Sequence, residues 1–238
     1  MTREEIIAKA ESFEGGWYHR IELTPGYFTP SVMEASWPIW DMIRNVRERL
    51  DYRKATVLDL GTMDGMWAFE AENLGALEII SGDIWQSAPS KRRVSFAREC
   101  LDSKVSLWDL NAQEMGEVMD GYRFSIIQCL GLLYHVQNPM LALHNIANVM
   151  TPDGHVILET AVMHKETGPW MRFNSDNGVY YDATTFWCPT MDCLHAMLDM
   201  AGLKTDGAIE RLKYGVTDRI CAIVMRNGKP LDPKLGME

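Results

Sequence analysis

The stretch 59–65 (DLGTMDG) combines an acidic residue with two glycines at a spacing that suits a small polar ligand. A short apolar run precedes it and a helical pattern follows, so the glycines fall where a strand turns into a helix. Glycine lets the backbone turn tightly and approach a ligand without a Cβ in the way. The free N–H groups at the start of the following helix add hydrogen-bond donors. We therefore predict that this turn binds a ligand through Asp59, Gly61, Thr62, Met63 and Gly65.

Two more aspartates, Asp83 and Asp109, stand at the ends of later strand-like runs. A nicotinamide enzyme would carry G-x-G-x-x-G in the first turn, and this pattern is absent. The alternative interpretation is a glycine-rich turn in another class of α/β protein, because aspartate at such ends often serves only as a helix N-cap.

The strand-end aspartate followed by Gly-x-x-x-Gly resembles motif I of the class I S-adenosylmethionine-dependent methyltransferases. This resemblance implies S-adenosyl-L-methionine as the cofactor, with Asp83 on the ribose hydroxyls and Asp109 on the adenine amino group. The other cofactor contacts that the resemblance implies are Ile84, Trp85, Leu110 and Leu132. In one respect the sequence departs from the family: Met63 replaces the middle glycine, so we expect the loop to lie differently or a little further from the cofactor.

The stretch 131–139 (GLLYHVQNP) resembles the G-x-L-Y-H-x-x-x-P signature of enzymes related to tRNA wobble-uridine carboxymethyltransferase. The stretch 186–190 (FWCPT) resembles the aromatic-x-Pro-Ser/Thr segment of that branch, and Trp40-Asp41 resembles its Trp-Asp pair. The match spans roughly residues 37–226. It implies an enzyme of the methyltransferase class.

The tRNA enzymes of this branch use carboxy-S-adenosylmethionine and hold its extra carboxylate with lysine, tyrosine and arginine. Tyr134 matches the tyrosine and Arg219 the arginine, but Ile39 stands where the lysine is expected. An unpaired carboxylate beside isoleucine would be costly to desolvate. We therefore expect ordinary S-adenosylmethionine and a small-molecule O- or N-acceptor, with a tRNA-modifying enzyme that uses the carboxylated cofactor as the alternative. A cofactor-binding subunit without activity is a third hypothesis, which only Met63 supports.

His135 follows the fourth strand and is a candidate general base, since imidazole titrates near neutral pH. The alternative is a structural or substrate-packing role. His19 is the second catalytic candidate, with a surface turn residue as its alternative. No histidine or cysteine spacing indicates a metal site. Aromatic residues crowd two segments and predict a water-excluding acceptor pocket, although they could equally bury the N-terminal helices. The substrate contacts that we predict are Trp17, Tyr18, Tyr27, Tyr134, Arg172, Tyr181 and Trp187.

Alternating strand-like and helix-like runs predict an α/β fold. We expect a doubly wound, Rossmann-like seven-stranded sheet with an antiparallel last strand, helices on both faces and an N-terminal helical cover. The expected strands are 55–61, 77–83, 105–110, 124–131, 155–163, 206–213 and 219–226. The expected helices are 3–13, 31–50, 65–74, 90–102, 112–120, 138–150 and 190–201. Residues 1–50 form the predicted N-terminal cap segment and residues 51–238 a single methyltransferase domain, in which the insertion 164–189 covers the site.

The 238 residues are 47% hydrophobic and carry a net charge of −10. An acidic surface repels phosphate backbones, so we expect no nucleic-acid partner. The basic runs 44–49 and 91–93 are interpreted as solvated helix faces. Five cysteines without a C-x-x-C pair, the lack of a signal-peptide core and the lack of a long apolar run predict a reduced, cytoplasmic protein without a membrane segment. The expected partner is a small-molecule substrate, and a homodimer is left open.

Overall fold

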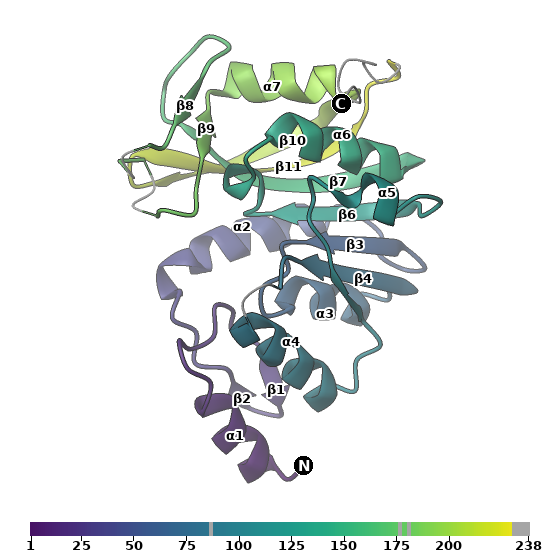
Figure 1. Cartoon of the computed structure of the whole chain (residues 1–238), viewed down its shortest axis with the longest axis vertical. Helices are drawn as coiled ribbons and strands as arrows, with labels where there is room; N and C mark the ends of the chain where they lie inside the picture. Colours follow the sequence, from purple (N-terminus) through teal and green to yellow (C-terminus); the bar gives the residue numbers. More distant parts are fainter. Residues whose placement is uncertain (86–87, 176–177, 180–181, 230–238) are drawn as a thin grey trace. The chain divides into compact units, whose positions relative to one another are not determined.

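A seven-stranded sheet in the order β10-β11-β7-β6-β3-β4-β5 forms the core of the computed structural model (Figure 1). The model describes residues 1–85, 88–175, 178–179 and 182–229, and no helix in these ranges is long and apolar enough to cross a membrane. Strand β4 runs parallel to β3 and β5, and β7 runs parallel to β6. The last strand, β11, runs antiparallel to β7. The predicted Rossmann-like sheet with an antiparallel last strand is confirmed.

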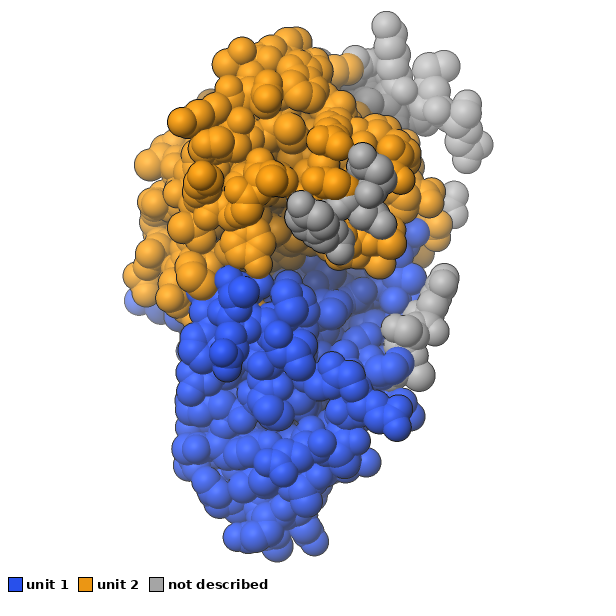
Figure 2. Space-filling model, turned by 90° about the vertical axis from the view of Figure 1, so that its left-hand side faces the viewer, with its two compact units in different colours: residues 1–37, 52–111 blue, residues 38–51, 112–238 orange. Residues whose placement is uncertain are grey.

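The chain groups into two compact units, which Figure 2 distinguishes by colour. Unit 1 holds residues 1–37 and 52–111, and unit 2 holds residues 38–51 and 112–238. Most of the second helix is grouped with unit 2, and the boundary predicted at residue 50 stays a prediction.

Unit 1 is built on three parallel strands, of which β3 and β4 are largely buried, whereas the residues of the edge strand β5 are half-buried or exposed. The capping box of Thr2 and Glu5 starts its first helix, as the sequence predicts. Its elements are α1 (Arg3–Glu11), β1 (Glu22–Thr24), β2 (Tyr27–Phe28), η1 (Glu34–Ser36), β3 (Thr56–Leu60), α3 (Met66–Asn73), β4 (Glu78–Asp83), α4 (Ala88–Cys100) and β5 (Ser106–Asp109).

Unit 2 combines the other four strands of the sheet with helices and a small separate hairpin. The hairpin, β8 with β9, lies inside the predicted insertion 164–189. The elements are α2 (Trp37–Arg47), α5 (Met115–Val118), β6 (Phe124–Leu130), η2 (Leu133–His135), α6 (Pro139–Val149), β7 (Met150–Met163), β8 (Met171–Phe173), β9 (Trp187–Pro189), α7 (Met191–Met200), β10 (Leu203–Tyr214) and β11 (Thr217–Arg226).

The helix predicted from residue 31 begins only at Trp37. Residues 31 and 32 are not helical, because Val32 donates its N–H to the Trp17 carbonyl and Ser31 forms a β-bridge with Trp17. The short 3-10 helix η1 lies between them and α2. Val32 is 62% exposed, so it is not part of an inward helical face. Pairing with a segment fourteen residues away in sequence therefore overrides the local helical periodicity.

The interpretation of residues 44–49 as a solvated face is wrong in part. Arg47 is buried. Arg49 donates to the Ala208 carbonyl at 3.0 Å and pairs with Glu210, both on β10. Arg49 thus ties the end of α2 to the edge strand of unit 2.

Helix α7 is capped by Thr190, a fully buried residue. Its Oγ1 accepts the Cys193 N–H at 3.1 Å and donates to the Gly168 carbonyl. We predict that Thr190→Ala lowers the free energy of unfolding by about 1–2 kcal/mol, because it removes a cap and leaves those groups unpaired. Urea unfolding measures the loss. Thr190→Ser keeps the oxygen and should retain most of the stability; an equal loss in both variants would contradict the capping role.

Candidate cofactor and acceptor site

The loop between β3 and α3 has the left-handed backbone that a close-approaching turn requires. Gly61 and Gly65 adopt φ values of +73° and +89°, and a Cβ on Gly65 would lie 2.7 Å from Phe69 and from Val94. Met63 adopts φ of +51°, a conformation that favours glycine. Its N–H donates to Oδ2 of Asp83 at 2.8 Å, which stabilises the strained residue. The loop thus accommodates methionine where the family has glycine.

A chain of buried hydroxyls fixes the base of this loop. Ser81 donates to Oγ1 of Thr62 at 2.7 Å, and Thr62 donates to Oδ2 of Asp59 at 2.7 Å. All three residues are buried. The Asp59 carboxylate and the Thr62 hydroxyl therefore hold the loop to β3 and β4.

Four of the predicted cofactor residues meet at the carboxyl ends of β4 and β5. Asp83 and Asp109 are paired in register, and the Leu110 N–H donates to the Asp83 carbonyl at 3.0 Å. Leu110 covers Gly82, where a Cβ would come within 2.8 Å of it. Ile84 is 45% exposed and offers the apolar surface that an adenine ring needs, whereas Trp85 is only 6% exposed. The two carboxylates and the exposed Ile84 thus lie at the same edge of the sheet, and their contacts to a nucleoside stay predictions.

Asp64 is the residue of this loop for which the sequence predicted no role. It is fully buried, and its Oδ2 accepts the N–H groups of Tyr18 and His19. Its Oδ1 accepts Nε of Arg93 at 2.8 Å. Arg93 is therefore a buried ion-pair partner, so the interpretation of 91–93 as a solvated face is wrong for this residue. An acidic residue inside a glycine-rich turn was the signal that could have drawn attention to it.

The N-terminal candidates divide into packing residues and residues near the loop. Trp17 is fully buried and donates Nε1 to the Ala10 carbonyl at 2.9 Å, so it packs α1 rather than facing a substrate. His19 is buried, which contradicts the surface-turn alternative, and its ring lies edge-on to Trp67. Tyr18 adjoins it and is half-buried. On β2, burial and the nearby Glu11 raise the pKa of Tyr27 above its ordinary value.

In unit 2, Gly131 opens the second predicted motif with φ of +70°. A Cβ at this position would lie 3.3 Å from the Tyr134 hydroxyl, so glycine leaves room for that side chain. Arg219 donates Nη2 to that hydroxyl at 2.8 Å and forms a two-bond fork with Glu159 at 2.7 and 2.6 Å. Burial opposes the charge of Arg219, but the Glu159 carboxylate holds its pKa well above the ordinary value. The arginine charge is thus matched within the protein.

Hydrogen bonds join the predicted insertion to residues 134–137. Nδ1 of His135 lies 3.0 Å from the Thr184 carbonyl and 3.2 Å from the Thr184 hydroxyl, the Phe186 N–H donates to the Tyr134 carbonyl at 2.7 Å, and Trp187 donates Nε1 to the Gln137 carbonyl at 2.9 Å. A proton on Nδ1 would be donated to the Thr184 carbonyl and would leave Nε2 as the basic nitrogen.

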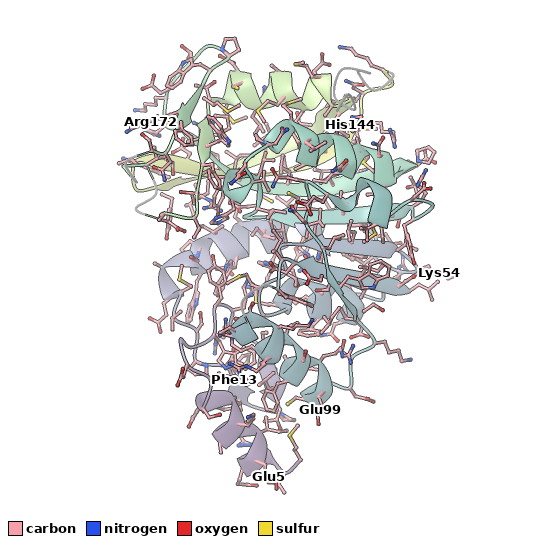
Figure 3. The ribbon with its side chains drawn as sticks, in the orientation of Figure 1. Glu5, Phe13, Lys54, Glu99, His144 and Arg172 are labelled. Atoms are coloured by element: carbon pink, nitrogen blue, oxygen red, sulfur yellow. The ribbon has the colours of Figure 1, made fainter. Side chains whose placement is uncertain are left out.

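The remaining predicted residues lie around this junction. Leu132 is half-buried before η2, and Arg172 is exposed on β8 (Figure 3). Tyr181 lies outside the described residues. The buried Asn174, which the sequence analysis overlooked, donates Nδ2 to the Thr185 hydroxyl at 2.7 Å and its N–H to the Phe186 carbonyl. Within the described ranges no cluster of metal-ligating side chains occurs.

The chain matches the methyltransferase domain family over residues 40–205. The protein belongs to this family. The predicted class I S-adenosylmethionine-dependent methyltransferase family is thereby confirmed, together with the cofactor that the family uses. The site residues stay predictions.

A tRNA U34 carboxymethyltransferase of Syntrophotalea carbinolica is 34% identical over 39% of this chain and 28% of its own length. A ubiquinone biosynthesis O-methyltransferase of Alkalilimnicola ehrlichii is 30% identical over 44% of this chain and 40% of its own. The chain thus aligns with less than half of either relative. The N-terminal domain of EvdMO1, solved with SAH bound, has the same fold, with a TM-score of 0.72, 20% identity and coverage of 95% and 97%.

We predict that Asp83→Ala weakens binding of S-adenosylhomocysteine by about 1.5–3 kcal/mol, because charge-assisted bonds to the ribose hydroxyls are lost. Isothermal titration calorimetry measures the change. Thermal unfolding without ligand controls for the lost bond to Met63. Unchanged affinity would contradict the assignment of Asp83 to the ribose.

We predict that Asp64→Ala lowers the free energy of unfolding by about 3–5 kcal/mol, since it leaves Arg93 buried without its carboxylate. Urea unfolding measures the loss. The matched control is Asp41→Ala, whose carboxylate is 74% exposed and 3.4 Å from Arg44; it should change stability by less than about 1 kcal/mol. Similar losses in both variants would contradict a special role for Asp64.

Proposed function

We propose that the protein transfers the methyl group of S-adenosyl-L-methionine to an oxygen or nitrogen of a small-molecule metabolite. The observation that carries the choice of the ordinary cofactor is the pairing of Arg219 with Glu159.

A carboxylated cofactor needs cationic partners for its additional charge. Arg219, which matches the arginine of the tRNA enzymes, already has Glu159 on both Nε and Nη2, and Glu159 is buried. A second carboxylate at this position would repel Glu159 in a poorly solvated environment. Ile39 supplies no charge in place of the expected lysine. These features favour a cofactor without the extra carboxylate.

The sulfonium of the bound cofactor activates the methyl group, so the residues of the chain chiefly position the two reactants and exclude water. In this proposal Asp83 and Asp109 hold the nucleoside while the 61–65 loop lies along the rest of the cofactor. In the tautomer in which Nδ1 of His135 donates to the Thr184 carbonyl, its Nε2 is the nitrogen that accepts the proton of a hydroxyl or amine acceptor. Aromatic residues such as Trp187 limit water access to the acceptor.

The charge distribution favours a small acceptor over RNA. The net charge is −10, and two of the arginines in the basic runs, Arg47 and Arg93, are buried. These buried charges cannot contact phosphates without unfolding. The names of the two relatives indicate different acceptors: a tRNA for one, and a compound of ubiquinone biosynthesis for the other. A tRNA-modifying transferase that uses carboxy-S-adenosylmethionine is therefore the alternative function.

The cofactor is tested by mass spectrometry of the ligand that copurifies with the protein and by thermal shift. S-adenosylhomocysteine at 100 times its dissociation constant should stabilise the protein by about 2.7 kcal/mol. A copurifying carboxylated cofactor, or salt-sensitive micromolar binding of bulk tRNA in a gel-shift titration, would instead support the alternative. Absence of stabilisation by either S-adenosylmethionine or its product would overturn both.

We predict that His135→Ala lowers the turnover of an acceptor that must lose a proton by about 10²–10⁴-fold. Cofactor affinity should change by no more than a few-fold. Steady-state kinetics and calorimetry separate the two effects, and His195→Ala, at an exposed position on α7, serves as the control. Wild-type turnover in His135→Ala would remove it from the reaction.

A further inference from the structure

A hollow of about 500 Å³ lies within unit 1, where α1 and α4 approach each other. Its walls come from the end of α1, from one face of α4 and from Trp85. The residues that line it are Lys9, Phe13, Trp85, Lys91, Arg92, Ser95, Phe96 and Glu99. Asp83, Ile84, Asp109 and Leu110 do not line it. Trp85, whose backbone N–H donates to Asp109 at 3.3 Å, is the predicted cofactor contact that the hollow shares.

Aromatic rings form the apolar part of the hollow. The rings of Phe13 and Phe96 lie 5.6 Å apart and join the two helices. Figure 3 shows Phe13 beside α4, on which Glu99 also lies. Phe96 and Trp85 are largely buried, so these walls are held by packing. Rings fixed in this way suit a ligand with a flat apolar ring system.

The charged side chains favour an anion. The lining of the hollow includes three cationic side chains, those of Lys9, Lys91 and Arg92, and one carboxylate, that of Glu99. The Lys9 ammonium lies 5.4 Å from the Phe13 ring centroid and the Lys91 ammonium 5.6 Å from that of Trp85. In the described part of the chain none of the three cations has an ion-pair partner. This local excess of positive charge is notable in a protein whose net charge is −10.

Trp85 supplies an independent indication of a ligand. The residue is 6% exposed, and its Nε1 is buried with no hydrogen-bond partner among the described residues. A buried N–H without an acceptor costs about 1–3 kcal/mol, so such donors normally have a partner. The indole lines the hollow but its Nε1 has almost no accessible surface, so a carboxylate or phosphate oxygen there would reach this donor after a rotation of the indole and would also lie close to the cations.

We propose that the hollow between α1 and α4 binds a small organic anion with a planar apolar body. The rings contact the body, Lys91 and Arg92 pair with the acidic group, and Nε1 of Trp85 donates to one of its oxygens. The site is distinct from the methyl-transfer site and does not depend on the proposed acceptor.

The probe for this site is 2-naphthoate, with the neutral 2-naphthol as its uncharged counterpart. Titration by calorimetry and by tryptophan fluorescence should show one saturable site for 2-naphthoate, weakened by added salt, and at least tenfold weaker binding of 2-naphthol. The same site should be measurable on protein saturated with S-adenosylhomocysteine. Equal binding of both probes, displacement by S-adenosylhomocysteine, or no saturable binding would overturn the proposal.

Variants locate the probe. Lys91→Gln combined with Arg92→Gln should weaken 2-naphthoate binding at least tenfold, and Trp85→Phe, which keeps a ring but removes the donor, should weaken it several-fold. Lys104→Gln, an exposed lysine of the same unit outside the hollow, should leave it unchanged. The Lys91/Arg92 double variant and Lys104→Gln should bind S-adenosylhomocysteine like the wild type, and thermal unfolding without ligand should show that Trp85→Phe, at a predicted cofactor contact, is folded. Undiminished 2-naphthoate binding in the double variant would place the probe elsewhere and overturn the proposal.

Discussion

The carboxylate of Asp64 is the constraint on which the organisation of unit 1 depends. One buried side chain accepts two backbone N–H groups from residues 18 and 19 and a guanidinium from α4. A buried carboxylate without such partners would be strongly unfavourable, so the three segments must meet wherever the motif I loop folds. The glycine-rich turn therefore does more than approach a ligand: it organises the segment that precedes the sheet.

Unit 2 also buries a pair of opposite charges, those of Arg219 and Glu159. Arg219 and Glu159 are buried on neighbouring antiparallel strands, and Tyr134 from the loop after β6 completes their hydrogen bonding. Because both charges are satisfied, the Tyr134 hydroxyl is held in one position. Breaking either the Asp64–Arg93 pair or the Arg219–Glu159 pair would leave a charge in an apolar environment, so both pairs hold their segments in fixed positions.

The sequence predicted the sheet and the β3–α3 turn well, because strand alternation and glycine at a left-handed turn are local properties. The start of α2 was predicted too early, because residues 31 and 32 pair with Trp17 and no local pattern records that pairing. Arg93 and Arg47 were assigned to solvent for a similar reason: the burial of an arginine depends on a distant partner, such as Asp64 for Arg93. Trp85 stays a predicted cofactor contact, and no local pattern in the sequence indicates that its side chain also lines the hollow beside α4.

In the proposed function, the junction between residues 134–137 and the segment 182–187 connects acceptor recognition with proton transfer. A proton on Nδ1 of His135, facing the Thr184 carbonyl, would leave Nε2 as the basic nitrogen. Asn174 binds this segment at Thr185 and Phe186, directly after the residue that contacts His135. The cofactor loop belongs to the other unit and shares none of these hydrogen bonds among the described residues. Changes in acceptor specificity can therefore arise in the insertion while the cofactor-binding turn is conserved in structure, provided that the carbonyl facing Nδ1 of His135 is retained.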